Sequence, residues 1–225
     1  MVRQAVRIEL PSGTTWHVHE AGKKLGYRAQ LPGARVFDLV AQSLRVAKAR
    51  GVDAIDRFTL ALPASWMVNS PAISKVIRRW ALPPHRDTCL ALIEVLEGGP
   101  DEWSADPETA QALRLGIASL GTEPYVTEAL SKVLALVVTD AVPLMPPPAR
   151  AFVLGDAATD DPDAFGRIAE WFARAALAHS AELEAVAREH REVELTGAGV
   201  LDRLLWFDSE GHVHFPKIER PAESS

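Results

Sequence analysis

Cysteine is nearly absent from this chain of 225 residues, which contains only Cys89. A single thiol cannot form a disulfide within the chain, so we expect a reducing compartment, the cytoplasm. Long hydrophobic runs are missing as well, since the longest, "VLALVV" at residues 133–138, is far too short to cross a bilayer. The first residues, "MVRQAVRIELPSG", turn polar too early for a secretory signal. We therefore expect a cytoplasmic protein without membrane insertion.

The signature motifs of common enzyme classes are also missing. The sequence has no Gly-x-Ser-x-Gly turn, no glycine-rich phosphate loop, no dinucleotide fingerprint and no His-Glu-x-x-His zinc motif. "HRDTC" would place His85 and Cys89 one helical turn apart, as a base and its nucleophile, but leucines surround Cys89 and favour a small core residue. We predict no catalytic residue and no cofactor, although the enzyme question stays open.

What the chain does contain is enough apolar sequence for a core. Hydrophobic residues make up 48% of it and charged residues 24%. The net charge of −6, from 24 basic and 30 acidic side chains, argues against general attraction to nucleic acid. Most of the sequence has the hydrophobic period of a helix. A helix after Asp106 has the clearest start, because aspartate is a good N-cap and Pro107 suits the first position.

These patterns predict a mainly α protein, a bundle or stack of about six to eight helices with a small β-hairpin at each end. Residues 1–220 are expected to form one domain: a hairpin over 1–25, a helical core over 34–195 and a hairpin over 200–218, before a flexible tail at 219–225. The second hairpin rests on "RLLWF" and "HVHFPKI" around a "DSEG" turn.

Three details of the helical core follow from the pattern. Residues 53–62 fit a strand or a helix, and Asp53 as a cap favours a helix that stops at Pro63. Another helix, which ends at Gly51, is expected to have one apolar face made of Val36, Leu39, Val40, Leu44 and Ala47. The longest helical pattern runs from about 162 to 194, with a break near Ser180 as the alternative.

Histidine alternates with valine in both predicted hairpins. His17 and His19 share one face of a strand, as do His212 and His214. If the hairpins pair, these four imidazoles would be able to bind zinc or another transition metal. The simpler interpretation, which the alternation favours, is that the valines face the core and the histidines face water. The sequence does not determine whether the hairpins pair.

A basic segment, "SKVIRRWALPPHR", groups Lys75, Arg78, Arg79 and Arg86 around Trp80. Cations beside an aromatic ring are typical of sites that hold phosphate or stack a base. The alternative is the solvated face of a helix, and the net charge of −6 favours it.

Tryptophan is frequent, with six residues. Large aromatic side chains at the edges of helices are good anchors for a protein partner, although most are buried inside their own domain. Trp66, Trp80 and Trp103 are the candidate anchors.

A set of residues recurs in a recognisable order over roughly residues 36–180: Asp53, Ala54, Ile55, Ala61, Leu62, Pro63, Trp103, Asp106, Pro107 and Pro146 to Pro148. This order resembles a bacterial helical family of unknown function. This chain departs from the family where "ASWMVNSP" replaces an arginine pair and a tryptophan pair, and the two hairpins have no counterpart. The resemblance implies an accessory protein encoded beside bacterial secretion machinery, with an interaction role and no catalytic residues to transfer.

The leading hypothesis for function is therefore a non-enzymatic protein-interaction module, an adaptor, chaperone or scaffold of a bacterial multi-protein assembly. Its expected partners are other proteins or further copies of the chain. Two alternatives remain: a metal-binding protein or enzyme that uses the strand histidines, and a nucleic-acid binder that uses the patch from Lys75 to Arg86.

Overall fold

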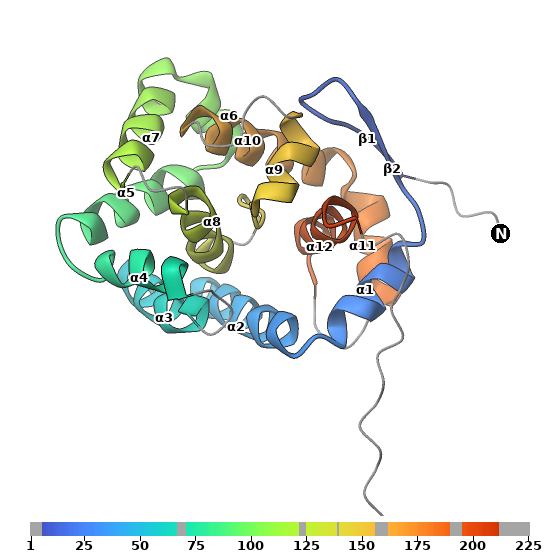
Figure 1. Ribbon diagram of the computed structural model, residues 1–225, viewed down its shortest axis with the longest axis horizontal. Helices are drawn as coiled ribbons and strands as arrows, with labels where there is room; N and C mark the ends of the chain where they lie inside the picture. Colours follow the sequence, from blue (N-terminus) through green and yellow to red (C-terminus); the bar gives the residue numbers. More distant parts are fainter. Residues whose placement is uncertain are drawn as a thin grey trace, which may run out of the picture.

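The computed structural model describes residues 6–66, 71–121, 125–138, 140–155, 162–189 and 195–211. These residues form one antiparallel pair of strands followed by twelve helices (Figure 1). The elements are β1 (Val6–Glu9), β2 (Thr15–Val18), α1 (Ala21–Ala29), α2 (Pro32–Ala49), α3 (Ala54–Trp66), α4 (Pro71–Arg79), α5 (His85–Glu97), α6 (Pro100–Ala105), α7 (Pro107–Ser119), α8 (Val126–Val137), α9 (Pro147–Leu154), α10 (Pro162–Ala178), α11 (Ser180–Glu189) and α12 (Gly197–Ser209). The mainly helical prediction is confirmed, but the described residues hold more helices than predicted. None of these helices combines the length and apolar character needed to cross a membrane.

The N-terminal hairpin is confirmed, but its second strand ends at Val18, and residues 21–25, which were predicted to belong to it, form the start of α1. Val6 lies opposite Val18, and Ile8 lies opposite Trp16. Ile8 and Trp16 are buried, because this face of the hairpin packs on the helices; the Trp16 ring meets Phe152 of α9 edge-on, with 5.6 Å between ring centroids. The alternation of apolar and polar residues was therefore sufficient to predict both strands.

The predicted C-terminal hairpin is wrong in its first strand. Residues 203–207, read as a strand, belong to α12, which begins where the Thr196 hydroxyl caps the Gly199 N–H at 3.0 Å. Leu201, Leu204 and Leu205 are fully buried. A helix that is buried on nearly every side has a continuous apolar run, which the hydrophobic period cannot distinguish from a strand. The second predicted strand, residues 212–218, lies outside the described residues.

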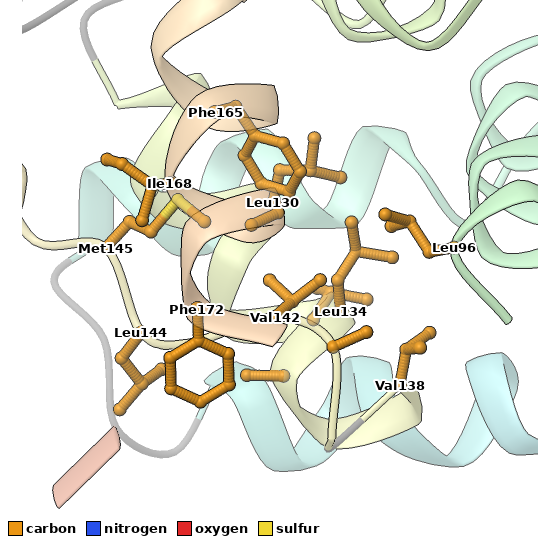
Figure 2. Packing of buried hydrophobic residues seen from close by; sticks show 14 of the residues in the cluster. Leu96, Leu130, Leu134, Val138, Val142, Leu144, Met145, Phe165, Ile168 and Phe172 are labelled. Atoms are coloured by element: carbon orange, nitrogen blue, oxygen red, sulfur yellow. The ribbon is translucent and has the colours of Figure 1, made fainter. Parts of the chain in front are cut away.

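The core is built around α8, in which ten of twelve residues are buried. This helix packs against α2, α3 and α4. Figure 2 shows another part of the core, where Phe165 of α10 lies toward Leu130 of α8, while Ile168 and Phe172 lie on the side of Met145 and Leu144. A central helix covered on several sides explains the long apolar run that the sequence shows at this point.

The predicted helix starts are largely confirmed. Asp106 accepts hydrogen bonds from the N–H groups of Glu108 and Thr109, at 3.3 and 3.1 Å, and so caps α7. Asp53 accepts from the Asp56 N–H at 2.9 Å at the start of α3, which settles residues 54–62 as helix. The predicted end is wrong, since α3 continues through Pro63 to Trp66.

Two further predictions concern the length of one helix and the buried face of another. The long pattern divides between α10 and α11 at His179, as the alternative with a break near Ser180 proposed. The predicted buried face of α2 is partly wrong: Leu44 is buried, whereas Leu39 is 46% exposed. The side of the helix that carries Phe37 and Asp38 faces the interior, where both side chains are buried.

Candidate functional site

A cavity of about 420 Å³ opens between α1, α2, α8, α12 and the segment that leads into α9. Its volume falls within the range of small-ligand and anchor pockets. The apolar lining consists of Leu31, Phe37, Leu144, Pro146 and Trp206; the small residues are Gly33 and Ala34; the charged ones are Arg28, Glu128, Lys132 and Glu210. We call it the α1–α12 cavity.

One wall of this cavity rests on a buried cluster of charged residues, which we call the arginine cluster: Arg28, Asp38, Asp202 and Arg203. All four are less than one tenth exposed. The Asp38 carboxylate accepts from Arg203 through both of its oxygens, with 3.1 Å between Arg203 Nε and Asp38 Oδ2. The Nη1 of Arg28 lies 3.4 Å from Asp38 Oδ1. One carboxylate is thus shared by two guanidinium groups that come from α1 and α12.

Burial dominates the electrostatics of this cluster. Loss of hydration lowers the pKa of Arg28, while the Asp38 carboxylate opposes that shift. Burial raises the pKa of Asp202, although Arg28, Arg203 and the Leu144 N–H, which donates to Asp202 at 2.7 Å, oppose the change. Arginine keeps its charge even so, because its ordinary pKa lies far above neutral pH.

Arg28 is the less completely paired of the two arginines. Within the described part of the chain, its buried Nε has no hydrogen-bond acceptor. Its guanidinium carbon lies 5.3 Å from the centroid of the Trp206 ring, which is cation–π distance. This contact positions the indole that forms one side of the α1–α12 cavity.

The other charges of the cavity are paired or lie at its rim. Lys132 donates to Glu128 at 2.7 Å, one turn away on α8, and both side chains are about 15% exposed. Glu210 is exposed, just after the end of α12. Since the inner cations each have an acidic neighbour, the cavity offers apolar contact more than a net charge. Such an arrangement supports binding, and the described lining contains no serine, threonine, cysteine or histidine.

A second buried ion pair joins α3 to α5. Arg57 is 3% exposed and donates to both carboxylate oxygens of Glu97, at 2.8 and 3.3 Å, and to the Val137 carbonyl at 3.2 Å. Lys48 lies 2.9 Å from the same carboxylate. Burial alone would raise the pKa of Glu97, but the hydrogen bonds from Arg57 and Lys48 reverse this and lower it. This pair holds helices together and lines no cavity described above.

The strand histidines lie as the simpler interpretation predicted. His17 and His19 are exposed on one face of the hairpin, with nearly parallel rings 6.1 Å apart, while Val18 between them is buried. His212 and His214 lie outside the described residues. Among the residues that are described, no group of three or more histidine, cysteine, aspartate or glutamate side chains is close enough to hold a metal.

The basic side chains of the segment around Trp80 do not lie on the same side of the helix as the tryptophan ring. Lys75, Arg78 and Arg79 are exposed on α4, and Arg86 lies 3.2 Å from Asp87. Trp80 is fully buried, with its indole nitrogen 3.5 Å from the Leu120 carbonyl. The cations therefore form a solvated helix face, and no base can stack on this ring.

The remaining predicted anchors and the predicted thiol belong to the interior or to helix ends. Trp103 is 3% exposed and lies in the core, so as placed it cannot anchor a partner. Trp66 is the last residue of α3. Cys89 is fully buried, and burial raises the pKa of its thiol to about 12, which leaves it protonated and unreactive at neutral pH.

Neither the arginine cluster nor the cavity beside it was predicted from the sequence. The available signal was polar residues set inside apolar runs: Asp38 directly after Phe37, and the Asp202–Arg203 pair within "VLDRLL". Charged residues in such positions are rarely buried without a partner, so they indicate a buried pair.

Comparison with known proteins identifies no relative, because no protein-family model, curated protein or solved structure matches this chain. The resemblance to a bacterial helical family therefore stays a prediction.

Proposed function

We propose that this chain is a non-enzymatic protein-interaction module, an adaptor, chaperone or scaffold of a bacterial multi-protein assembly. In this proposal the α1–α12 cavity receives an apolar side chain of the partner. The observation that carries it is the cavity itself: a preformed hollow of about 420 Å³ with Phe37, Leu144 and Trp206 in its wall. Pockets that accept one aromatic or aliphatic anchor supply much of the affinity of protein interfaces.

The charges around the cavity favour an uncharged anchor. Lys132 is paired with Glu128, and Arg28 shares the Asp38 carboxylate with Arg203. A charged side chain that entered the interior of the cavity would lose its hydration beside charges that are already paired, which is costly, whereas Glu210 lies at the exposed rim. An apolar side chain gains about 25 cal/mol for each Å² that it buries there.

Exposed apolar side chains on α2, which lines the cavity, and on its neighbour α3 support the same function. The described residues include eight large apolar side chains that are exposed, and four of them lie on the neighbouring helices α2 and α3: Leu39, Val46, Ile55 and Leu60. Helix α2 also contributes Phe37 to the cavity. Apolar side chains concentrated on adjacent helices are typical of surfaces that a partner covers.

Filling the cavity tests this function. Ala34 is half-buried in the cavity lining at the start of α2, so Ala34→Trp should place an indole where the partner's anchor would lie. The matched control is Ala112→Trp, because Ala112 is exposed on α7. Tagged wild-type and variant chains would be expressed in the native host, cross-linked, purified and compared by quantitative mass spectrometry.

We expect a protein that is retained by the wild-type chain and by Ala112→Trp but is lost from Ala34→Trp, with circular dichroism showing all three folded. Equal retention by all three chains would show that the cavity is not the partner site. A small molecule that co-purifies with the wild-type chain and is displaced by Ala34→Trp would replace this proposal with a ligand-binding function.

A further inference from the structure

A second hollow lies between the hairpin and α10, on other elements than those of the α1–α12 cavity. Its volume is about 550 Å³. On one side are Arg7 and its neighbours in β1, and on the other is a face of α10 that includes Arg167, Trp171 and Arg174. We call it the β1–α10 groove.

Strand β1 presents a free main-chain edge to this groove. The described sheet has two strands, so β1 has β2 on one side only. The Leu10 N–H donates to the Thr14 carbonyl at 2.9 Å, which makes Leu10 a hydrogen-bonded position of the antiparallel pair. Because such positions alternate, the main-chain groups of Arg7 and Glu9 point away from β2. The Glu9 carbonyl confirms this direction, since it accepts from the indole nitrogen of Trp171 at 2.8 Å.

The Trp171 contact also shows which part of the edge is open. It occupies the Glu9 carbonyl, so the main chain of Arg7 is the place where another strand would pair. Ala175 and Ala178 line the α10 side of the groove with small side chains, which allows a main chain to approach. An exposed strand edge of this kind is the surface that extended peptides use when they add a strand to a sheet.

The side chains of the groove carry an excess of positive charge. Arg7, Arg167 and Arg174 face two glutamates, Glu9 and Glu170. Glu170 is paired with Arg174 at 3.2 Å, and Glu9 accepts from Thr15 at 2.8 Å. Arg7 and Arg167 are exposed and form no hydrogen bond or ion pair within the part of the chain that the structure describes. These two guanidinium groups are therefore ready to pair with carboxylates from outside.

We propose that the β1–α10 groove binds an extended acidic segment of a partner protein, which pairs with β1 at Arg7 as a third strand. Its carboxylates lie against Arg7 and Arg167. The strand edge fixes the extended conformation of the segment, and the two arginines select for acidic side chains. This assignment does not depend on the α1–α12 cavity, because it rests on other residues.

The test uses the full chain and a fluorescent peptide of four Val-Glu repeats, with Val-Gln and Val-Lys peptides of equal length as comparisons. Binding is measured by fluorescence polarisation at low and high salt. Arg7→Glu combined with Arg167→Glu should weaken binding of the Val-Glu peptide by at least about tenfold, which corresponds to about 1.4 kcal/mol. The milder pair Arg7→Gln with Arg167→Gln serves if charge reversal lowers the melting temperature. Lys75→Glu with Arg188→Glu changes the net charge equally on exposed sites elsewhere and should leave binding unchanged.

Strand pairing is tested separately from charge by N-methylation of alternate peptide bonds. Methylation in one register removes the N–H groups that would pair with β1, and in the other register it leaves them intact. We expect one methylated peptide to lose binding and the other to retain it. Absence of binding by the Val-Glu peptide, equal weakening in both charge-reversed pairs, or equal binding of both methylated peptides would overturn the proposal. None of these outcomes involves Ala34, so the proposed function would be judged independently.

Discussion

Removal of the Asp38 carboxylate is the most direct test of what holds the wall of the α1–α12 cavity. In Asp38→Ala, two buried guanidinium groups lose their shared acceptor. Arg203 loses a bond to each oxygen and Arg28 loses a contact of 3.4 Å. Breaking a buried ion pair from one side typically costs about 3–5 kcal/mol, because the remaining charge stays buried without compensation.

The contacts that remain in Asp38→Ala keep the expected loss of unfolding free energy within that range. Arg203 keeps a hydrogen bond from Nη1 to the Gly199 carbonyl, and Arg28 keeps its contact with the Trp206 ring, so neither arginine is left without any partner. Asp202 also remains nearby, but within the described part of the chain its carboxylate forms no hydrogen bond or ion pair with either arginine and accepts from the Leu144 N–H instead. For a chain of this size, 3–5 kcal/mol corresponds to a melting temperature lower by about 6–20 °C.

Urea and thermal unfolding followed by circular dichroism measure this loss. The control is Arg114→Ala, which removes an exposed pair with Asp163 at 3.1 Å and should cost less than about 1 kcal/mol. Asp38→Asn keeps one acceptor oxygen and should fall between the two. If Asp38→Ala were no more destabilising than Arg114→Ala, the arginine cluster would not support the cavity wall, and our reasoning about its burial would be refuted.

Three further results are expected. The pKa of Asp202 is raised in the folded protein, so its contribution to the free energy of unfolding is most favourable below its ordinary pKa of 3.8 and is lost as pH rises. The pKa of Glu97 is lowered, so its contribution is present above its ordinary pKa of 4.5 and is lost as pH falls. Urea unfolding between pH 3 and 7 should therefore show Asp202→Asn gaining stability relative to wild type as pH rises and Glu97→Gln losing it; parallel profiles would contradict both assignments. Cys89 should not react with a thiol reagent in the folded protein and should react fully in guanidinium, because it is buried and its thiol has a pKa of about 12. Rapid labelling of the native protein would show instead that α5 opens readily. His17→Ala with His19→Ala should hardly change the melting temperature, with or without EDTA, because both side chains are exposed; a large shift that EDTA abolishes would indicate a structural metal.

The parts of the fold that could be predicted are those with local signals. Asp106 and Asp53 cap their helices through residues two or three positions away, so the sequence around them contains the whole interaction. The alternation of β1 and β2 is also local. Helix α12 was missed because its environment is set by other elements, α1, α9, α10 and α11, which bury it on nearly every side and remove its helical period.

The candidate site could not be predicted for the same reason. Asp38 and Arg203 are separated by 165 positions, and nothing near either residue indicates that the other is its partner. Trp80 shows the converse error. Its basic neighbours on the sequence suggested a surface site, but the helix turns the cations outward and the ring into the core. Which side of a helix is buried depends on what packs against it, and local pattern indicates this only where the apolar stripe is narrow.

The two proposed binding surfaces are held in a fixed relation by the end of α12. Trp206 of this helix lines the α1–α12 cavity. Asp208, two residues later, accepts from the Trp16 indole of β2 at 2.8 Å and from Lys24 of α1, so the hairpin that borders the β1–α10 groove is fastened to the same helix. A partner that fills both surfaces would meet them already positioned, and its second contact would form as an intramolecular step. If one partner fills both surfaces, Ala34→Trp and the Arg7 and Arg167 reversals should each weaken the binding of that same partner. The combined variant would then lose both contacts. Two separate partners would instead each respond to one change alone.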